Sequence, residues 1–286
     1  MPQNFITHSS IPDINCFPLT WASDWGEDNY GLWMAFTFKK IRYALRWIKP
    51  GRFMMGSPED ELERYKDESQ HEVILTQGFW LGETTCAQEL WKAVMGKNPS
   101  FIKGTQKPVG NVSWDDCMAF IKEINQRMPG LNLRLPTEAE WEYACRAGTQ
   151  TPFSFGDNNN ADLVNSSDDH LHVVESKGKV WGEPVEVGSL PCNQWGLYEM
   201  HGNVYEWCSD WYGEYQAETI INPVGPENGE ERLLRGGCWV SPGRHLRSAA
   251  RATSAPRSLY DTTGFRLARG HQEGQGLAEP TKENGE

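Results

Sequence analysis

The chain has 286 residues and a formal net charge of −12 at pH 7, and it is long enough to bury a sizeable core. Its acidity argues against a nucleic-acid or anionic-membrane partner, because affinity for phosphate comes from clustered Lys and Arg. The first 21 residues contain no basic region followed by an apolar run, and no stretch reaches the length of a membrane span. We therefore expect a cytoplasmic protein without a membrane partner.

Four short strands are expected in the first third of the chain, from alternating apolar residues bounded by turn signals. They are Trp33–Phe38, Ile41–Ile48, Glu72–Leu75 and Trp80–Glu83. The first two are separated only by Lys39 and Lys40, which predicts a hairpin that turns at these two residues. This hairpin belongs to an N-terminal extension over residues 1–45.

Three helices are expected in the middle of the chain, at residues 84–96, 113–130 and 137–148. Thr84 or Thr85 is expected to cap the first helix, and Ser113 the second. Thr137 is followed three residues later by Glu140, which is the pattern of a capping box. A fifth strand is expected at Arg232–Trp239. The fold class is therefore α+β, with one main domain over residues 46–269 and a polar, disordered tail over 270–286.

The seven cysteines form no C-x-x-C pair and show no metal-ligand spacing. They are Cys16, Cys86, Cys117, Cys145, Cys192, Cys208 and Cys238. We expect reduced, mostly buried thiols rather than a disulfide or zinc framework. Only Cys238 lies in a segment that resembles a site.

Five motifs occur in an order that resembles the formylglycine-generating enzyme (sulfatase-modifying factor) family. They are RWIKPGRFMMGS, NVSWDDCMAFIKEIN, RLPTEAEWEYACRAGT, WGLYEMHGNVYEWCSDWYG and RGGCW…LRSAAR…GFRLA, between about Arg46 and Ala268. The resemblance implies the irregular C-type-lectin-like fold of that family, with little regular secondary structure. Three activities are known on this fold, and each makes a different demand on the sequence.

Formylglycine-generating enzymes oxidise a sulfatase cysteine with copper held by two cysteines. In this chain Cys238 stands where the family's Gly-Gly turn has Ser, the first copper cysteine falls on Ser241, and the second falls in PGRHL, which has none. A hydroxyl does not replace a thiolate as a ligand of Cu(I). No copper is therefore expected, although an oxidase of sulfatase cysteines stays as the alternative function if Cys238 pairs with a distant cysteine.

Ergothioneine-type synthases bind iron through histidines of an added helical bundle. None of the seven histidines lies in an H-x-x-x-H-x-E pattern, so this activity is not expected. His170 and His172 could bind a metal from one strand face, or they could lie in a solvated acidic loop.

Variable proteins of diversity-generating retroelements only bind ligands, and their varied positions do not become Lys, Glu, Gln, Met or Trp. Between Cys238 and Thr263 only Trp239 falls outside the allowed set. The residues between the framework positions would then form an adaptable surface for an unknown protein or peptide. They are Val240, Ser241, Pro242, His245, Ala250, Ala252, Thr253, Ser254, Ser258, Leu259, Tyr260 and Thr262. Tyr260 is expected to contribute most; a degenerate paralogue without such a surface is the other interpretation.

The segment EMHGNVYEW resembles the family's structural calcium loop. The resemblance assigns Glu199, Gly202, Val204 and Glu206 as oxygen ligands of Ca²⁺, which prefers hard oxygen donors. The other interpretation makes Glu206 a buried carboxylate that is hydrogen-bonded to backbone amides.

The arginines of the C-terminal motif have a structural interpretation. Arg247, Arg251 and Arg266 are expected to pair with carboxylates beneath the loop, since a bidentate guanidinium can hold irregular backbone in place.

Overall fold

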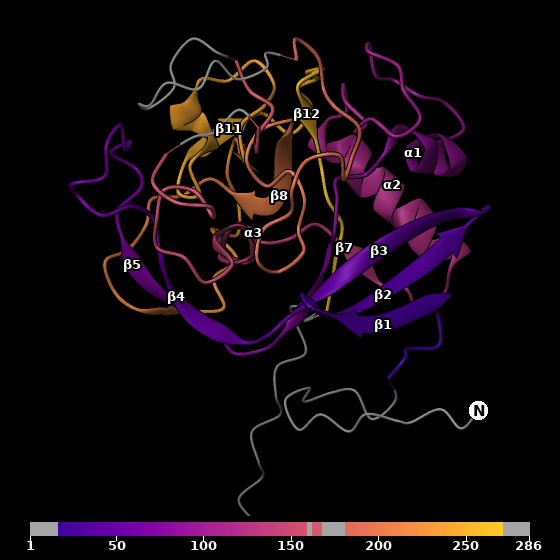
Figure 1. Cartoon of the computed structure of the whole chain (residues 1–286), viewed down its shortest axis with the longest axis horizontal. Coiled ribbons are helices and arrows are strands. Elements are labelled where there is room, and N and C mark those ends of the chain that lie inside the picture. The colour runs from indigo at the N-terminus through magenta and orange to yellow at the C-terminus, as the bar shows by residue number, and fades with distance from the viewer. Residues whose placement is uncertain (1–16, 159–161, 168–180, 271–286) are drawn as a thin grey trace, which may run out of the picture.

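The structure is a computed structural model that describes residues 17–158, 162–167 and 181–270. Its strands form three small sheets, and three short α-helices lie among long irregular loops. Figure 1 shows helices α1 and α2 on one side of the molecule and strands β4 and β5 on the opposite side. No helix in the described ranges is long and apolar enough to span a bilayer.

The largest sheet has six strands in the order β1-β2-β3-β6-β13-β7. Their bounds are β1 Asp24–Asp28, β2 Gly31–Phe38, β3 Ile41–Ile48, β6 Phe79–Gly82, β13 Ala268–Arg269 and β7 Leu133–Arg134. The second sheet, in the order β11-β10-β8-β12, contains β11 Arg251–Ser254, β10 Arg232–Arg235, β8 Tyr205–Trp211 and β12 Thr263–Gly264. The third contains β4 Gly51–Met55, β5 His71–Leu75 and β9 Ile220–Ile221.

The predicted N-terminal hairpin is present as β2 and β3, which pair up to Phe38 and Ile41. Lys39 and Lys40 have φ values of 47° and 71°, and two positive φ angles are what a two-residue hairpin turn needs. Strand β1 extends this hairpin and was not expected. Because β3 pairs with β6, the expected boundary after residue 45 falls inside a strand of the main sheet.

The helices are α1 Gln88–Met95, α2 Trp114–Arg127 and α3 Glu138–Arg146. The expected caps of α2 and α3 are confirmed, because Ser113 and Thr137 both form capping boxes. The expected start of α1 at Thr84 or Thr85 is wrong, and the helix begins after Ala87. The Cys86 amide donates to the Phe265 carbonyl, and the Cys86 carbonyl accepts from the Val109 amide. These two bonds keep the segment before α1 extended.

The core lies between α2, the six-stranded sheet and β8. Trp91, Phe120 and Phe265 form an aromatic cluster with ring centroids 5.2–5.9 Å apart, and Trp207 is fully buried beside them. Such aromatic burial dominates core energetics.

Candidate functional site

The C-terminal motif RGGCW begins at Arg235, where β10 ends. The strand therefore ends four residues before Trp239, its expected last residue. Gly236 and Gly237 both have positive φ, at 92° and 72°. A Cβ on Gly237 would lie 2.9 Å from the Leu246 side chain, so only glycine fits this turn. The turn places Gly237 against the short 3₁₀ helix η2, Gly243–Leu246.

Cys238 and Ser241 are buried together inside this turn. The Ser241 hydroxyl accepts from the Cys238 amide at 3.0 Å and lies 3.1 Å from the Cys238 sulfur. Burial raises the pKa of the Cys238 thiol, which keeps it protonated at neutral pH. A protonated, enclosed thiol is a poor nucleophile and a poor metal ligand.

Three residues of the expected adaptable surface are buried, so their assignment to an exposed surface is wrong. They are Ser241, Ala250 and Ser254, with exposed fractions of 4–7%. Ser241 caps the turn, the carbonyl of Ala250 accepts from Arg235 at 2.6 Å, and Ser254 pairs within the second sheet. Burial here follows from contacts that local sequence does not reveal.

The other expected surface residues are partly or largely exposed. Val240, Leu259 and Tyr260 are each about half exposed, at 48%, 53% and 50%. The half-buried residues are Pro242, His245, Ala252, Thr253, Ser258 and Thr262. Within this second group, His245 lies 3.2 Å from the Tyr65 hydroxyl, and Thr253 donates to Glu231 at 2.6 Å.

Phe101 is a further exposed aromatic residue that the sequence did not single out. Its side chain is 71% exposed. Asn111 links its neighbourhood to Tyr260, because the Asn111 amide donates to the Tyr260 carbonyl while its side chain donates to the Pro99 carbonyl. We call Val240, Leu259, Tyr260 and Phe101 the outer surface.

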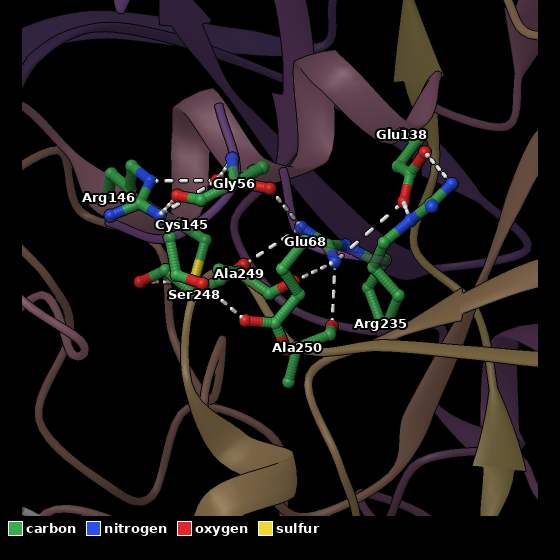
Figure 2. Close-up of polar contacts among 12 residues, drawn as sticks. Gly56, Glu68, Glu138, Cys145, Arg146, Arg235, Ser248, Ala249 and Ala250 are labelled. Atoms are coloured by element: carbon green, nitrogen blue, oxygen red, sulfur yellow. Dashed lines mark hydrogen bonds and ion pairs between the residues drawn. The ribbon is translucent and has the colours of Figure 1, made fainter. Parts of the chain in front are cut away.

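Beneath this surface, Arg235 is fully buried and holds the loop by its carbonyls (Figure 2). Its guanidinium pairs with Glu142 of α3 and donates to the carbonyls of Ser248, Ala249 and Ala250 at 2.6–2.9 Å. One arginine therefore fixes three successive residues of irregular backbone to a helix.

The expected pairing of Arg247 and Arg251 with carboxylates is confirmed. Arg247 binds Glu61 and Glu68, with nitrogen-to-oxygen distances of 2.6 Å to each. Arg251 binds both oxygens of Glu138, at 2.7 and 3.0 Å. The attraction of these carboxylates raises the pKa of both guanidinium groups, although their burial opposes it, so the arginines stay charged.

The expected pairing of Arg266 is also confirmed, and its partner is Glu206. The guanidinium donates to both carboxylate oxygens at 2.7 Å, and the Trp141 indole donates to one of them at 2.8 Å. Glu206 is thus a buried carboxylate, but its donors are side chains rather than the backbone amides that the sequence suggested. We call the four pairs of Arg235, Arg247, Arg251 and Arg266 the arginine frame.

These contacts do not fit the expected calcium set of Glu199, Gly202, Val204 and Glu206. A cation at Glu206 would face the positive guanidinium of Arg266 at bonding distance. The two oxygens of Glu199 accept from backbone amides instead, at 2.9 and 3.1 Å, and burial raises its pKa to about 7. In the described part of the chain no three His, Cys, Asp or Glu side chains converge as a metal site.

His201 holds η2 in place and was not singled out by the sequence. Its Nδ1 lies 2.7 Å from the Leu246 carbonyl, and its Nε2 lies 3.0 Å from the Ser154 hydroxyl. Burial lowers its pKa to about 4, so it is a neutral structural link. His170 and His172 lie outside the described residues, as do Cys16 and the expected tail after Gly270.

Comparison with known proteins agrees with these motifs. The family model of the sulfatase-modifying factor enzyme 1-like domain matches residues 39–271. The chain belongs to this family. Its members differ in length and in reported activity, so family membership leaves the activity of this chain open.

The formylglycine-generating enzyme of Mus musculus is 33% identical over 213 residues, which cover 70% of this chain and 54% of the mouse protein. The serine/threonine-protein kinase pkn1 of Chlamydia caviae is 39% identical over 169 residues, or 57% of this chain and 24% of the kinase. The chain therefore spans about half the length of the mouse enzyme and a quarter of the kinase.

Among solved structures, the variable protein 1 of Treponema denticola superimposes with a TM-score of 0.72 at 27% identity. The match covers 83% of this chain and 98% of the Treponema protein. The C-type-lectin-like fold that the motifs implied, α+β with little regular secondary structure, is thereby confirmed.

Proposed function

We propose that this member of the family is a non-catalytic binding protein that presents its outer surface on the arginine frame. The observation that carries the proposal is the buried pair of Cys238 and Ser241. The position where the oxidases of this family hold a copper cysteine has a serine, and the serine hydroxyl is engaged by the Cys238 amide.

The chemistry of this pair disfavours cysteine oxidation. Cu(I) is a soft ion that prefers thiolates, and this turn offers one thiol whose pKa is raised by burial. Cys238 contacts the Ser241 oxygen rather than a second sulfur. The six cysteines of the described residues are all free thiols, as expected from their spacing.

The outer surface has the composition of a recognition site. Aromatic side chains give a large contact area with few rotatable bonds to immobilise on binding, and Phe101 and Tyr260 present two of them to solvent. Apolar side chains grouped on a surface mark sites of protein interaction more often than chance exposure. The occupant that we propose is therefore a protein or peptide with apolar side chains, reached through residues 240–262 and Phe101.

The alternative, an oxidase of sulfatase cysteines, is favoured by the likeness to the mouse enzyme and by the presence of Cys238 in the loop. It is tested by incubating the chain with Cu(I), oxygen and a cysteine peptide of the sulfatase type, with a formylglycine-generating enzyme as positive control. We expect no formylglycine by mass spectrometry. Formylglycine formation that disappears in Cys238→Ala would establish the oxidase instead.

Binding is tested by selecting ligands from a displayed peptide library with the purified chain. Each enriched peptide is then compared on the wild type and on a surface variant, Val240→Ser, Leu259→Ser and Tyr260→Ala. The matched control changes three apolar residues elsewhere that are 40–60% exposed, Trp25→Ala, Ile221→Ser and Val224→Ser. Peptides that need the outer surface support the proposal, and a selection that enriches none contradicts it.

A further inference from the structure

A separate cavity of about 490 Å³ opens between residues 58–62 and residues 150–158. Its volume falls within the range of small-molecule sites, about 300–1,000 Å³. Part of its wall is apolar and is formed by Pro58, Leu62, Pro152 and Phe153. Leu62 is 71% exposed, so most of this large apolar side chain is open to solvent at the cavity.

The rest of the wall includes Arg247, whose guanidinium donors are all engaged within the protein. Its five N–H donors make five hydrogen bonds: to Glu61, twice to Glu68, and to the carbonyls of Glu63 and Arg244. A guanidinium has only five donors. Arg247 therefore has none left for a ligand, which disfavours an anion in this cavity.

Glu61 is the buried carboxylate of the same wall. Its side chain is only 4% exposed, and one of its oxygens accepts from Arg247 at 2.6 Å. Its second oxygen accepts no hydrogen bond from the described residues and is open to solvent. A charged donor that enters the cavity can replace water at this oxygen and form a charge-assisted hydrogen bond.

Two exposed carboxylates, Asp60 and Asp157, line the same cavity. With Glu61 they give the cavity wall three carboxylates beside the one guanidinium of Arg247. Arg146 also acts on Glu61 at longer range, but it is paired with Glu142 at 2.8 Å. The cavity therefore combines an apolar wall with a net negative potential.

We propose that this cavity binds an organic cation, an ammonium group carried on a hydrocarbon body. The hydrocarbon packs against Leu62, Pro152 and Phe153. The ammonium donates to the unused oxygen of Glu61 and is attracted by the two carboxylates at the rim. This site is independent of the outer surface, and it would give the protein a small-molecule ligand as well as a macromolecular one.

The proposal is tested by calorimetric titration of the full chain with 4-phenylbutylamine. Two probes of similar shape, neutral 4-phenylbutanol and anionic 5-phenylpentanoate, separate charge from apolar fit. We expect the amine to bind at least about tenfold more tightly than the alcohol, a difference that a charge-assisted hydrogen bond can supply. Equal binding of amine and alcohol, tighter binding of the anion, or no amine binding up to about 5 mM would each overturn it.

Variants locate the ammonium group. Glu61→Gln should weaken amine binding about tenfold and leave alcohol binding unchanged. Because Glu61 also holds Arg247, Asp60→Asn with Asp157→Asn provides a second test at exposed positions, with an expected loss of about threefold. Glu227→Gln, an exposed acid outside the cavity wall, is the control. An amine affinity that both cavity variants leave unchanged contradicts the assignment.

The pH dependence gives an independent readout. Desolvation by burial raises the pKa of Glu61, with Arg247 and Arg146 opposing the shift and Glu68 adding to it. The probe amine stays protonated below neutral pH, so its affinity should fall as pH is lowered and Glu61 takes up its proton. The affinity of the alcohol should not follow this change. Amine affinity that is flat from pH 8 to 4 contradicts the role of Glu61.

Discussion

Residues 235–266 present two faces that differ in kind. The inward face carries the arginine frame, in which each guanidinium is buried and bound to a carboxylate from a distant part of the chain. The outward face carries Val240, Leu259 and Tyr260, each about half exposed. This irregular segment is therefore held by its charged residues, and several of its apolar side chains remain in contact with solvent.

The frame compensates for the small amount of regular structure in the segment. Strand β11 has four residues and β12 only two, so ladder hydrogen bonds alone leave much of the loop without partners. The guanidinium groups of Arg235, Arg251 and Arg266 bind backbone carbonyls as well as carboxylates. They thereby satisfy polar backbone groups that would otherwise be buried without partners.

The largest expected effect comes from breaking the inward face at Arg235. Arg235→Ala leaves Glu142 as a buried carboxylate without this partner and frees three carbonyls. Removing one partner of a buried ion pair costs about 3–5 kcal/mol, so the free energy of unfolding in urea should fall by that amount. A loss below about 1 kcal/mol for Arg235→Ala would show that the frame does not hold the loop.

The next effect depends on pH and concerns Glu199, which lies beside the frame. Its ordinary pKa is 4.5 and burial raises it to about 7 in the folded protein. The folded state therefore keeps a proton that the unfolded chain loses, so this group's contribution to stability falls as pH rises from 4.5 to about 7. Over that pH interval, the free energy of unfolding of Glu199→Gln should rise by up to about 3 kcal/mol relative to that of the wild type. A stability difference that does not change with pH would contradict the assignment.

Substitutions on the outward face should change the free energy of unfolding only slightly. Leu259→Ser and Tyr260→Ala each remove a half-exposed side chain, and such surface changes usually stay within about 0.5 kcal/mol. Thermal unfolding of both variants beside Arg235→Ala would give the sharpest contrast between the faces. If either variant lost more than about 2 kcal/mol of unfolding free energy, its side chain would belong to the core, and the two faces would not differ as described.

The smallest expected effect is that of calcium. Arg266 occupies both oxygens of Glu206, so adding millimolar Ca²⁺ should leave the melting temperature unchanged. A ligand that binds the native state must raise stability. An upward shift that Glu206→Gln abolishes would restore the calcium site that the sequence suggested and would overturn our placement of Glu206 in the frame.

The features that could be predicted from the sequence are those that depend on local contacts or on strong motifs. The capping boxes of Ser113 and Thr137 depend on residues three positions apart, and the Lys39–Lys40 turn depends on its own backbone. The start of α1 was missed because Cys86 bonds to Phe265, far along the chain. The pairing of Arg247, Arg251 and Arg266 was predicted, but their partners were not, since 179 residues separate Arg247 from Glu68.

The site was predictable only in part for the same reason. The expected exposure of Ser241 fails because Gly237 turns the chain and the Cys238 amide then bonds its hydroxyl. Phe101 was missed because it joins the surface through Asn111 rather than through the C-terminal motif. The Phe101 contact connects segments that the sequence keeps apart, whereas the Ser241 contact spans only three residues and depends on the direction of the glycine turn.

The most direct test of the account measures the affinity of a selected peptide for the surface variant Val240→Ser, Leu259→Ser and Tyr260→Ala, alongside the melting temperature of that variant. We expect an affinity at least about a hundredfold lower, because aromatic and apolar anchors are lost, and an unchanged melting temperature. The control Trp25→Ala, Ile221→Ser and Val224→Ser should bind as the wild type does. Full affinity in the surface variant, or an equal loss in the control, would contradict the claim that the outward face recognises the partner.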